Sequence, residues 1–200
     1  ASTAGVTRKW LPTMDQTRHQ AEVLLDNVTV SASTLMGTET QAWPQLKKII
    51  SLAKIAVSAE QMGGAQEMLD KTVAFTQERV QFGRAIASFQ AIKHKAADMM
   101  LKCEVARSAV YYAACVAQEA MSADGDAKIA AELDEAAAMA KCYCSDTFFF
   151  NAGSAIQMYG GVGFTWEYDP HLYFKRAKSS ELFLGNGAQQ RELIAQMLLD

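Results

Sequence analysis

The feature that most constrains the fold of this 200-residue chain is a helical spacing of apolar residues over most of its length. In residues 43–79, leucine, isoleucine, alanine and valine recur at intervals of three and four, the period of one face of an α-helix. A second helix is predicted over residues 88–121, and an alanine-rich third one ends near residue 159. Two shorter helices are predicted, one beginning at Pro170 and one over residues 187–199.

Residues that commonly begin or end helices separate these segments. Glycine favours the C-terminal end of a helix, Ser and Asp favour the N-cap, and proline is tolerated in the first turn. The predicted signals are Gly83 as a C-terminal cap, Ser88 as an N-cap, Asp124 or Asp126 as the next N-cap, Gly160–Gly161 as a stop, and Pro170 in a first turn. Because the connections are short, neighbouring helices should be antiparallel, which predicts an up-and-down bundle of the four-helix type.

The first forty residues have a strand-like pattern instead. In AEVLLDNVTVSAST, residues 21–34, the apolar residues predict two short strands about a turn at Asp26–Asn27. A lone hairpin is only marginally stable in water, so it needs a larger sheet or a helix to pack against. Glycine and proline then mark a boundary. The predicted organisation is a mainly α fold with a short β-hairpin in residues 1–37 and a helical domain in residues 38–200.

Charge and composition exclude several classes of function. The 19 Lys and Arg against 22 Asp and Glu give a net charge of −3, which provides no basic surface for nucleic acid. Every long apolar run is interrupted by a charge, so no membrane span is predicted. The four cysteines lie in helix-like stretches and are expected to be buried thiols of a reducing compartment. The three histidines lack ligand spacing, and no metal site is predicted.

Two short stretches have the composition of an anion-binding site. ERVQFG places Arg79 and Phe82 at the end of a helix, and QMYGGVGF places Gln157 before Gly160 and Gly161. An arginine with exposed backbone N–H groups is what a pyrophosphate requires. Each stretch also has a purely structural explanation, since an arginine near a helix C-terminus favours the helix dipole and two glycines commonly end a helix. The residues alone leave both explanations open.

Three longer segments of the sequence resemble a known family. TVAFTQERVQFGRAIASFQAIKHKAADM and AIQMYGGVGFTWEYDPHLYFKRAK look like the C-terminal helical domain of the acyl-CoA dehydrogenases, and PTMDQTRHQAEVLLDNVTV resembles the end of their middle β-domain. The resemblance covers nearly the whole chain. It implies that residues 1–37 are a remnant of the β-domain and that the chain, which lacks an initiator Met, is the back part of a longer protein. No targeting segment is expected.

The resemblance also implies a cofactor, FAD, lying across a subunit interface. Arg79 resembles the arginine that pairs with the pyrophosphate of the neighbouring subunit's FAD, and Phe82 the aromatic residue beside it. Gln90 resembles a glutamine near the adenosine. The other FAD-binding residues that the resemblance implies are Gln157, Gly160 and Gly161 of the Q-x-x-G-G segment, and Asn186 at the position of a threonine.

The catalytic base of that family is not found at its expected places. The family usually carries a glutamate before Gly-Thr, and an ungapped alignment of RAKSSELFLGNGAQQR puts Leu184 there. A minority of members supply the glutamate from the first long helix, where Ala53 stands, followed by Lys54 at a position often held by arginine. Glu181 is an alternative base, since it shares a face with Leu184 if the segment is helical there. The catalytic residue therefore stays unassigned.

GFTWEYDPHLY resembles a bacterial subgroup that includes heteromeric dehydrogenases of steroid side-chain and dicarboxylate degradation. The first hypothesis is a cytoplasmic bacterial subunit that shares an FAD site in a homo- or hetero-oligomer, a dimer or tetramer, and takes its base from a partner. It implies an acyl-CoA substrate, α,β-desaturation, and electron-transfer flavoprotein or a similar acceptor. The alternatives are a self-sufficient dehydrogenase with a relocated base and a non-catalytic, flavin-free assembly domain.

Overall fold

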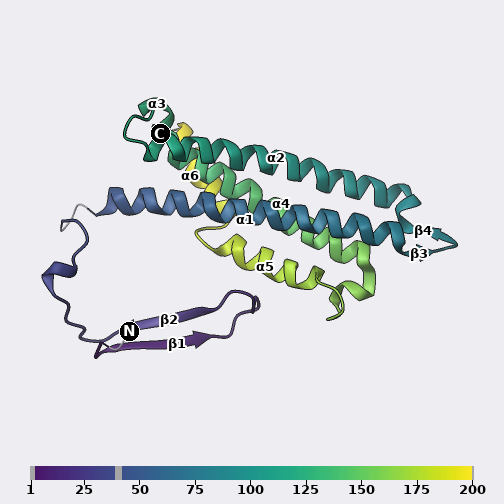
Figure 1. The fold of residues 1–200 in the computed structure, drawn as a ribbon, viewed down its shortest axis with the longest axis horizontal. Helices are drawn as coiled ribbons and strands as arrows, with labels where there is room; N and C mark the ends of the chain where they lie inside the picture. The colour runs from purple at the N-terminus through teal and green to yellow at the C-terminus, as the bar shows by residue number, and fades with distance from the viewer. Residues whose placement is uncertain (1–2, 39–41, 200) are drawn as a thin grey trace. The chain divides into compact units, whose positions relative to one another are not determined.

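The structure is a computed structural model that describes residues 3–38 and 42–199. It divides into two compact units, Ala1–Lys47 and Lys48–Asp200, and the elements of each are labelled in Figure 1. The long helix α1, Trp43–Glu78, begins at the end of the first unit and belongs mostly to the second. The boundary predicted between residues 37 and 38 stays a prediction.

The first unit contains one antiparallel strand pair. Strand β1, Val6–Leu11, pairs with β2, Gln20–Leu25, with Val6 opposite Leu25. The hairpin predicted about Asp26–Asn27 is therefore wrong, because β2 pairs with the segment before it and residues 28–30 form no strand. Asp26 N–H instead donates to Gly5 O at 2.9 Å, and Asn27 takes a φ of 49°. A short 3₁₀ helix, η1 (Ala32–Thr34), follows.

The second unit is the predicted helical bundle. Its other long helices are α2, Gln90–Met121, and α4, Leu133–Tyr159. Helices α5, Pro170–Leu182, and α6, Gly187–Leu199, pack against α4, as does α2. Successive long helices run in opposite directions in Figure 1, so the up-and-down arrangement is confirmed. The short elements are α3 (Ala127–Ala131), β3 (Val80–Gln81), β4 (Arg84–Ala85), η2 (Ile86–Ser88) and η3 (Gly160–Phe164).

Three of the predicted helix ends are confirmed. The Asp126 carboxylate accepts hydrogen bonds from the backbone N–H groups of Lys128 and Ile129 and caps α3. The single helix predicted from this cap to near residue 159 is interrupted at Glu132, so it forms α3 and α4. Helix α4 ends at Gly160, whose φ of 67° suits a glycine. Pro170 occupies the first turn of α5, where its missing N–H costs no hydrogen bond.

Two predicted caps are wrong, and both lie between α1 and α2. Gly83 does not cap α1; with Phe82 it forms the two-residue turn of the β3–β4 hairpin, in which both residues have positive φ, 54° and 76°. This is the turn that matches the twist of two paired strands. Ser88 does not cap α2, because it lies in η2 and its hydroxyl donates to Ala85 O. The N-cap of α2 is Phe89.

The core of the bundle combines small, sulfur-containing and aromatic residues from α1, α2, α4 and α5. A fully buried Asn151 on α4 donates to Ala65 O on α1 and to Met99 O on α2, which ties the three helices together. A Cβ at Gly64 would lie 2.5 Å from the Phe148 ring, so α1 and α4 approach closely there. The principal buried cluster consists of Ala65, Met68, Leu69, Met99, Cys103, Phe148, Ala152, Ala155, Met158 and Ala177.

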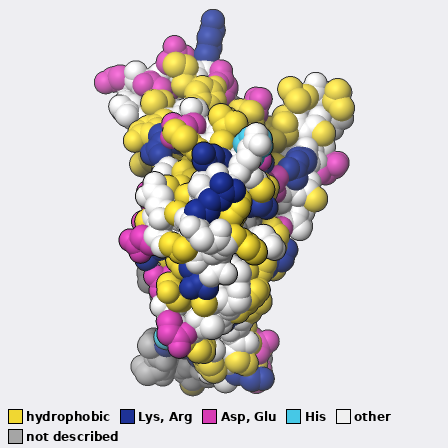
Figure 2. Space-filling view, turned by 90° about the vertical axis from the view of Figure 1, so that its right-hand side faces the viewer, with side chains coloured by type: hydrophobic (Ala, Val, Ile, Leu, Met, Phe, Trp, Pro, Cys, Tyr) yellow, Lys and Arg dark blue, Asp and Glu magenta, His cyan; other side chains and the backbone are white. Residues whose placement is uncertain are grey.

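The surface and the buried groups bear on other classes of function. Acidic and basic side chains are interspersed on the face shown in Figure 2. Among the described residues, no helix is long and apolar enough to cross a membrane, and no group of three or more His, Cys, Asp or Glu is placed to hold a metal ion. The four cysteines are free thiols, three of them buried. Burial raises the pKa of the Cys144 thiol to about 12.

Candidate functional site

The end of the bundle where α1 and α4 stop holds most of the predicted binding residues. The Phe75 ring on α1 stacks on the Tyr159 ring on α4, with 3.9 Å between centroids, and the Tyr159 hydroxyl donates to Lys71 O at 3.2 Å. These contacts place the residues after α1 beside those after α4, at the right-hand end of the bundle in Figure 1. We call this group the arginine end; it comprises Arg79, Phe82, Gln90, Gln157, Gly160 and Gly161.

Arg79 is held by its backbone and free at its side chain. Its N–H donates to Phe75 O at 2.9 Å, and its carbonyl accepts from Ile86 N–H at 2.8 Å, so the residue is fixed where α1 passes into the hairpin. The side chain is exposed. Within the described parts of the chain, no carboxylate or carbonyl engages its guanidinium. An exposed, unpaired arginine can donate charge-assisted hydrogen bonds to an anion.

Phe82 stands out at the tip of the hairpin. Its side chain is 92% exposed and its φ is 54°, a region that costs a bulky residue free energy. The ring makes an edge contact with Phe89 at 6.0 Å, and the Arg84 guanidinium lies over the other ring at 4.1 Å. An exposed aromatic residue in a costly conformation provides a flat surface for a planar ligand.

The glycines after α4 leave the backbone open to a ligand. Nothing lies within 4 Å of the position that a Cβ would take at Gly160 or at Gly161. Gln157, one turn earlier, is exposed and lines a groove of about 610 Å³ between α2, α4 and α5. Gln90 is also exposed, and its amide nitrogen lies 3.3 Å from His94 Nε2. The arginine end thus offers a cation, amides, an aromatic ring and unobstructed backbone.

Asn186 and Leu184 lie elsewhere, in the turn between α5 and α6. Helix α5 ends at Leu182, and Leu184 and Gly185 both have positive φ, 60° and 95°. Asn186 then starts α6: its side-chain oxygen accepts from Gln189 N–H, and its own N–H donates to the Gln189 side chain. This reciprocal pair is a capping box. Residues 183–186 are called the α5–α6 turn below.

The residues that follow Leu184 and Ala53 both lie near one buried lysine. Lys141 Nζ donates to Gly185 O at 3.1 Å, next to Leu184. Lys54, next to Ala53, lies close enough for its charge to lower the pKa of Lys141. Ala53 itself is half-buried on α1. The residues at these positions are apolar, and neither side chain can accept a proton.

Comparison with known proteins identifies the family. The model of the acyl-CoA dehydrogenase C-terminal domain matches residues 41–199. This chain belongs to the acyl-CoA dehydrogenase family. It is 36% identical over 187 residues to acyl-CoA dehydrogenase IpdE2 of Mycolicibacterium smegmatis, covering 93% of this chain and 51% of that protein. The chain thus spans about half the length of the curated relatives it matches.

Solved structures of acyl-CoA dehydrogenases have the same fold. Butyryl-CoA dehydrogenase from Megasphaera elsdenii superposes with a TM-score of 0.89 at 30% identity, over all of this chain and 50% of that one. A steroid ACAD variant designated Tcur3481-Tcur3483 superposes with a TM-score of 0.80 at 25% identity, over 98% of this chain and 49% of that one. The predicted fold class, a helical bundle of this family, is confirmed.

The residues of the arginine end fit FAD, the cofactor expected of an acyl-CoA dehydrogenase. Among the described residues no anion pairs with Arg79, Gly160 and Gly161 leave room for close backbone approach, and Phe82 is open to solvent. Helix α5 separates Gly161 from Asn186, and its 13 residues correspond to about 20 Å. The predicted FAD residues therefore form two groups and not one.

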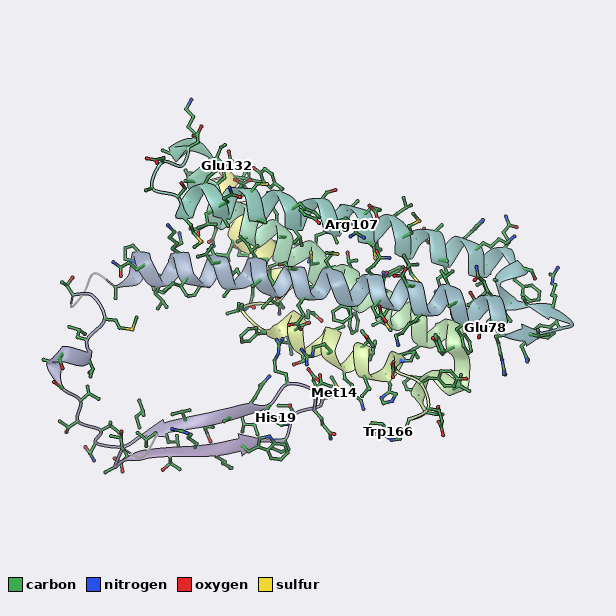
Figure 3. All side chains as sticks on the ribbon, in the orientation of Figure 1. Met14, His19, Glu78, Arg107, Glu132 and Trp166 are labelled. Atoms are coloured by element: carbon green, nitrogen blue, oxygen red, sulfur yellow. The ribbon has the colours of Figure 1, made fainter. Side chains whose placement is uncertain are left out.

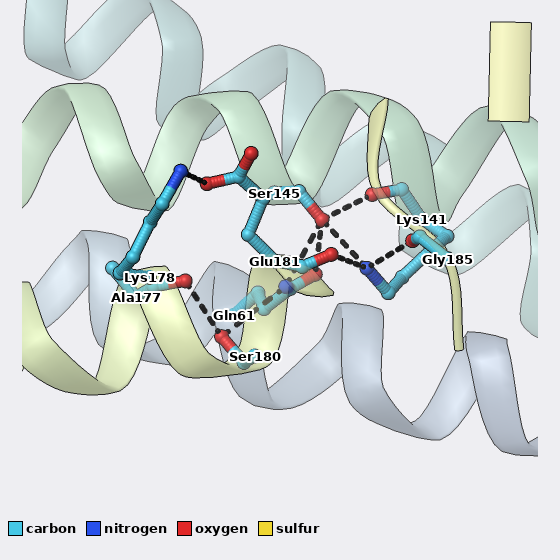
Figure 4. A network of polar contacts seen from close by, with 8 residues as sticks. All are labelled: Gln61, Lys141, Ser145, Ala177, Lys178, Ser180, Glu181 and Gly185. Atoms are coloured by element: carbon cyan, nitrogen blue, oxygen red, sulfur yellow. Dashed lines mark hydrogen bonds and ion pairs between the residues drawn. The ribbon is translucent and has the colours of Figure 1, made fainter. Parts of the chain in front are cut away.

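Glu181 is not placed as the sequence argument required. A helix through residue 184 would place Glu181 and Leu184 on one face, whereas α5 ends at Leu182. The Glu181 carboxylate is bound by Lys178 Nζ at 3.0 Å, its side chain is 21% exposed, and it lines the same groove as Gln157. Figure 4 shows this carboxylate paired with Lys178, while the Glu181 carbonyl accepts from Lys141.

Three other acidic or imidazole side chains do not gather at either group. An exposed Glu167 accepts a hydrogen bond from Thr165, which lowers its pKa. His171 is buried, with the Trp166 ring edge-on at 4.8 Å; Figure 3 marks Trp166. Glu192 accepts from the Gln196 amide on the same helix.

Sequence reasoning missed Lys141. It lies in the run AAMAKCYC of α4, where the neighbouring positions one turn away are Ala137 and Ser145. Both are fully buried, and a lysine at that helical spacing belongs to the buried face. That spacing was the available signal.

Proposed function

We propose that this chain is part of an FAD-dependent acyl-CoA dehydrogenase and shares a flavin site with a partner chain that supplies the catalytic base. The observation that carries the proposal is that Leu184 and Ala53 occupy the base positions while the arginine end keeps its binding groups. Glu181, the nearest carboxylate in sequence to Leu184, is already paired with Lys178. A shared, asymmetric site explains why one half is complete and the other is not.

The reaction removes a proton from the carbon next to the thioester and a hydride from the β-carbon. FAD, when bound, supplies the hydride acceptor. Arg79 would hold the pyrophosphate by charge-assisted hydrogen bonds, the open backbone at Gly160 and Gly161 would admit it, and Phe82 would offer its ring to a planar part of the cofactor. Proton removal needs a carboxylate in a dry pocket, since desolvation raises its pKa toward the operating pH. No residue at position 184 or 53 performs that step.

Two further observations support a two-chain site. The predicted FAD residues form groups at the two ends of α5, which suits one chain contributing to two different flavins. The steroid ACAD relative has a double designation, Tcur3481-Tcur3483, as a two-chain enzyme would. We further propose electron-transfer flavoprotein or a similar protein as the electron acceptor, an acyl-CoA as the substrate, and a cytoplasmic location.

The test uses the full-length protein, purified alone and together with the protein encoded beside it. Flavin absorbance is recorded, and acyl-CoA substrates are added with an artificial electron acceptor. We expect turnover only when the partner chain is present. Turnover by this protein alone would contradict the proposal of a missing base. A flavin-free protein in every preparation would favour an assembly domain without catalysis.

A self-sufficient dehydrogenase is the second candidate. The specific observation in its favour is that Glu181 lines the groove that Gln157 also lines, so a carboxylate and a predicted FAD residue share one depression. If Glu181 is the base, Glu181→Gln abolishes turnover, whereas Glu192→Gln, a matched change on the exposed surface of α6, leaves it intact. Unchanged turnover in Glu181→Gln removes this candidate.

A further inference from the structure

Lys141 makes an unusual set of contacts inside the bundle. Its side chain is fully buried on α4. Nζ donates to Ser145 Oγ at 2.9 Å, to Glu181 O at 3.1 Å and to Gly185 O at 3.1 Å. An ammonium has three N–H donors, so each one meets an oxygen. Figure 4 shows the three contacts converging on the nitrogen.

Two of these oxygens belong to the end of α5 and to the α5–α6 turn. Glu181 O belongs to the last turn of α5, where carbonyls lack a helical partner and the helix dipole favours a cation. Gly185 O lies within the turn. Between them, Leu184 O accepts from the buried side chain of Gln190 on α6 at 3.0 Å. Side chains from two different helices therefore fix three carbonyls of five consecutive residues.

The turn needs such support because its backbone is costly. Leu184 has a φ of 60°, in the left-handed region that a leucine adopts only when its surroundings impose it. Gly185 has a φ of 95°, and a Cβ there would lie 2.5 Å from Gln190 Nε2. The conformation of residue 184 therefore depends on the groups that hold its neighbours.

The surroundings of Lys141 disfavour its charged form. Burial lowers its pKa from 10.5 to about 8, and the positive charge of Lys54 on α1 acts in the same direction. The charge of Glu181 on α5 opposes the shift, as do Cys142 and Cys144 on α4 itself. A fully buried lysine is rare unless its ammonium group is paired. Here the ammonium group donates hydrogen bonds to backbone carbonyls at the turn.

We propose that Lys141 is a positioning residue: by bonding Glu181 O and Gly185 O, it holds residue 184 and Asn186 in the place from which this chain meets the flavin. This inference rests on the proposed function for its catalytic consequence. Its structural part concerns only the turn. Lys141 acts through the backbone of the turn and touches no reacting atom.

The test compares Lys141→Met with Lys178→Met in the full-length protein with its partner chain. Lys178 is the matched control, because it also lies beside Glu181 but binds the carboxylate and not the backbone of the turn. Amide hydrogen exchange at residues 183–187 should become at least about tenfold faster in Lys141→Met. Without the two bonds from Lys141 to backbone carbonyls, the turn opens more often and exposes its N–H groups. Exchange in α2 should be unchanged, and Lys178→Met should behave as wild type.

Catalysis provides the second measurement. We expect Lys141→Met to lower kcat by on the order of 100-fold with little change in KM, because a misplaced turn affects the transition state more than substrate binding. Equal exchange rates at the turn in Lys141→Met and wild type would overturn the proposal. A wild-type protein with a protected turn but neither flavin nor turnover would overturn the proposed function alone.

A milder variant guards against a failure to fold. Lys141→Gln removes the charge and keeps a donor on a shorter side chain. If Lys141→Met is not obtained folded, Lys141→Gln should still give faster exchange at residues 183–187 than Lys178→Met does. Wild-type exchange in a folded Lys141→Gln variant counts against the proposal.

Discussion

At the arginine end, Arg79, Phe82 and the glycines after α4 lie at the surface with unobstructed space around them. At the α5–α6 turn, by contrast, the fully buried side chains of Lys141 and Gln190 hold the backbone from inside the bundle. The first region holds the groups that the resemblance predicts for FAD; at the second, leucine stands where the resemblance predicts the base. We infer that packing maintains the backbone of the turn whether or not a reactive group stands there.

The largest effect is expected from restoring a carboxylate at the turn. In Leu184→Glu, the backbone is already in the conformation that presents residue 184. Turnover by this chain without its partner should rise by about 10²–10⁴-fold, the usual worth of a positioned general base. The assay is acyl-CoA-dependent reduction of an artificial acceptor. Leu184→Gln is the isosteric control and should stay inactive; no gain in Leu184→Glu would mean that the turn does not face the flavin.

Removing the cation from the arginine end should weaken flavin binding. Arg79→Ala deletes a charge-assisted contact, which corresponds to an increase in the Kd for FAD of about 10–100-fold. Arg84→Ala is the matched control, since that guanidinium lies over Phe89 in the same hairpin. Flavin absorbance after dialysis measures retention. Equal loss in both variants would show that the hairpin fold, and not the Arg79 charge, is what matters.

The buried charge at the turn should appear in the pH dependence of stability. The pKa of Lys141 is lowered from 10.5 to about 8. Below pH 8 the native protein therefore buries a charged lysine, which lowers its free energy of unfolding. That cost is relieved between pH 8 and 10.5, where the native state has lost a proton that the unfolded chain keeps. Across this window, wild type should gain about 1–3 kcal/mol relative to Lys141→Met.

Urea unfolding of both proteins at several pH values measures that difference. Parallel pH dependences of wild type and Lys141→Met would mean that Lys141 is uncharged, or fully solvated, in the native state.

The smallest effect concerns Asn186, which has a structural role and a predicted cofactor role. Asn186→Ala removes the cap of α6 and should cost about 1 kcal/mol of stability, a fall in Tm of about 2–4 °C. Asn186→Asp keeps a capping oxygen and should retain stability. Calorimetry measures the cap and flavin absorbance measures the cofactor role. If both variants lose stability equally, the capping box is not what Asn186 provides.

Local patterns accounted for much of the helical unit. The first helix was predicted over residues 43–79 and is Trp43–Glu78, and the last was predicted at its observed bounds, Gly187–Leu199. Helical hydrogen bonds and caps join residues three or four apart, so a short window of sequence contains the information. Asp126 and Pro170 were read correctly for the same reason.

The pairing of distant segments could not be predicted from a short window of sequence. Strand β2 looked able to pair with the residues after it, and only the fold shows that its partner is Val6–Leu11. Gly83 was misread because a glycine with positive φ serves a helix end and a hairpin turn equally well. Glu181 was placed on the face of Leu184 because the end of α5 was not foreseen.

By itself, the sequence determined the helical period, most helix ends, the family and the absence of a carboxylate at positions 184 and 53. Each of these depends on residue identity or on neighbours within one or two turns. The tertiary structure decided that Arg79 and Gly160 share one end of the bundle, that Glu181 turns to Lys178, and that Lys141 holds the α5–α6 turn. Those facts join residues far apart in the chain, and only the packing of one helix on another brings them together.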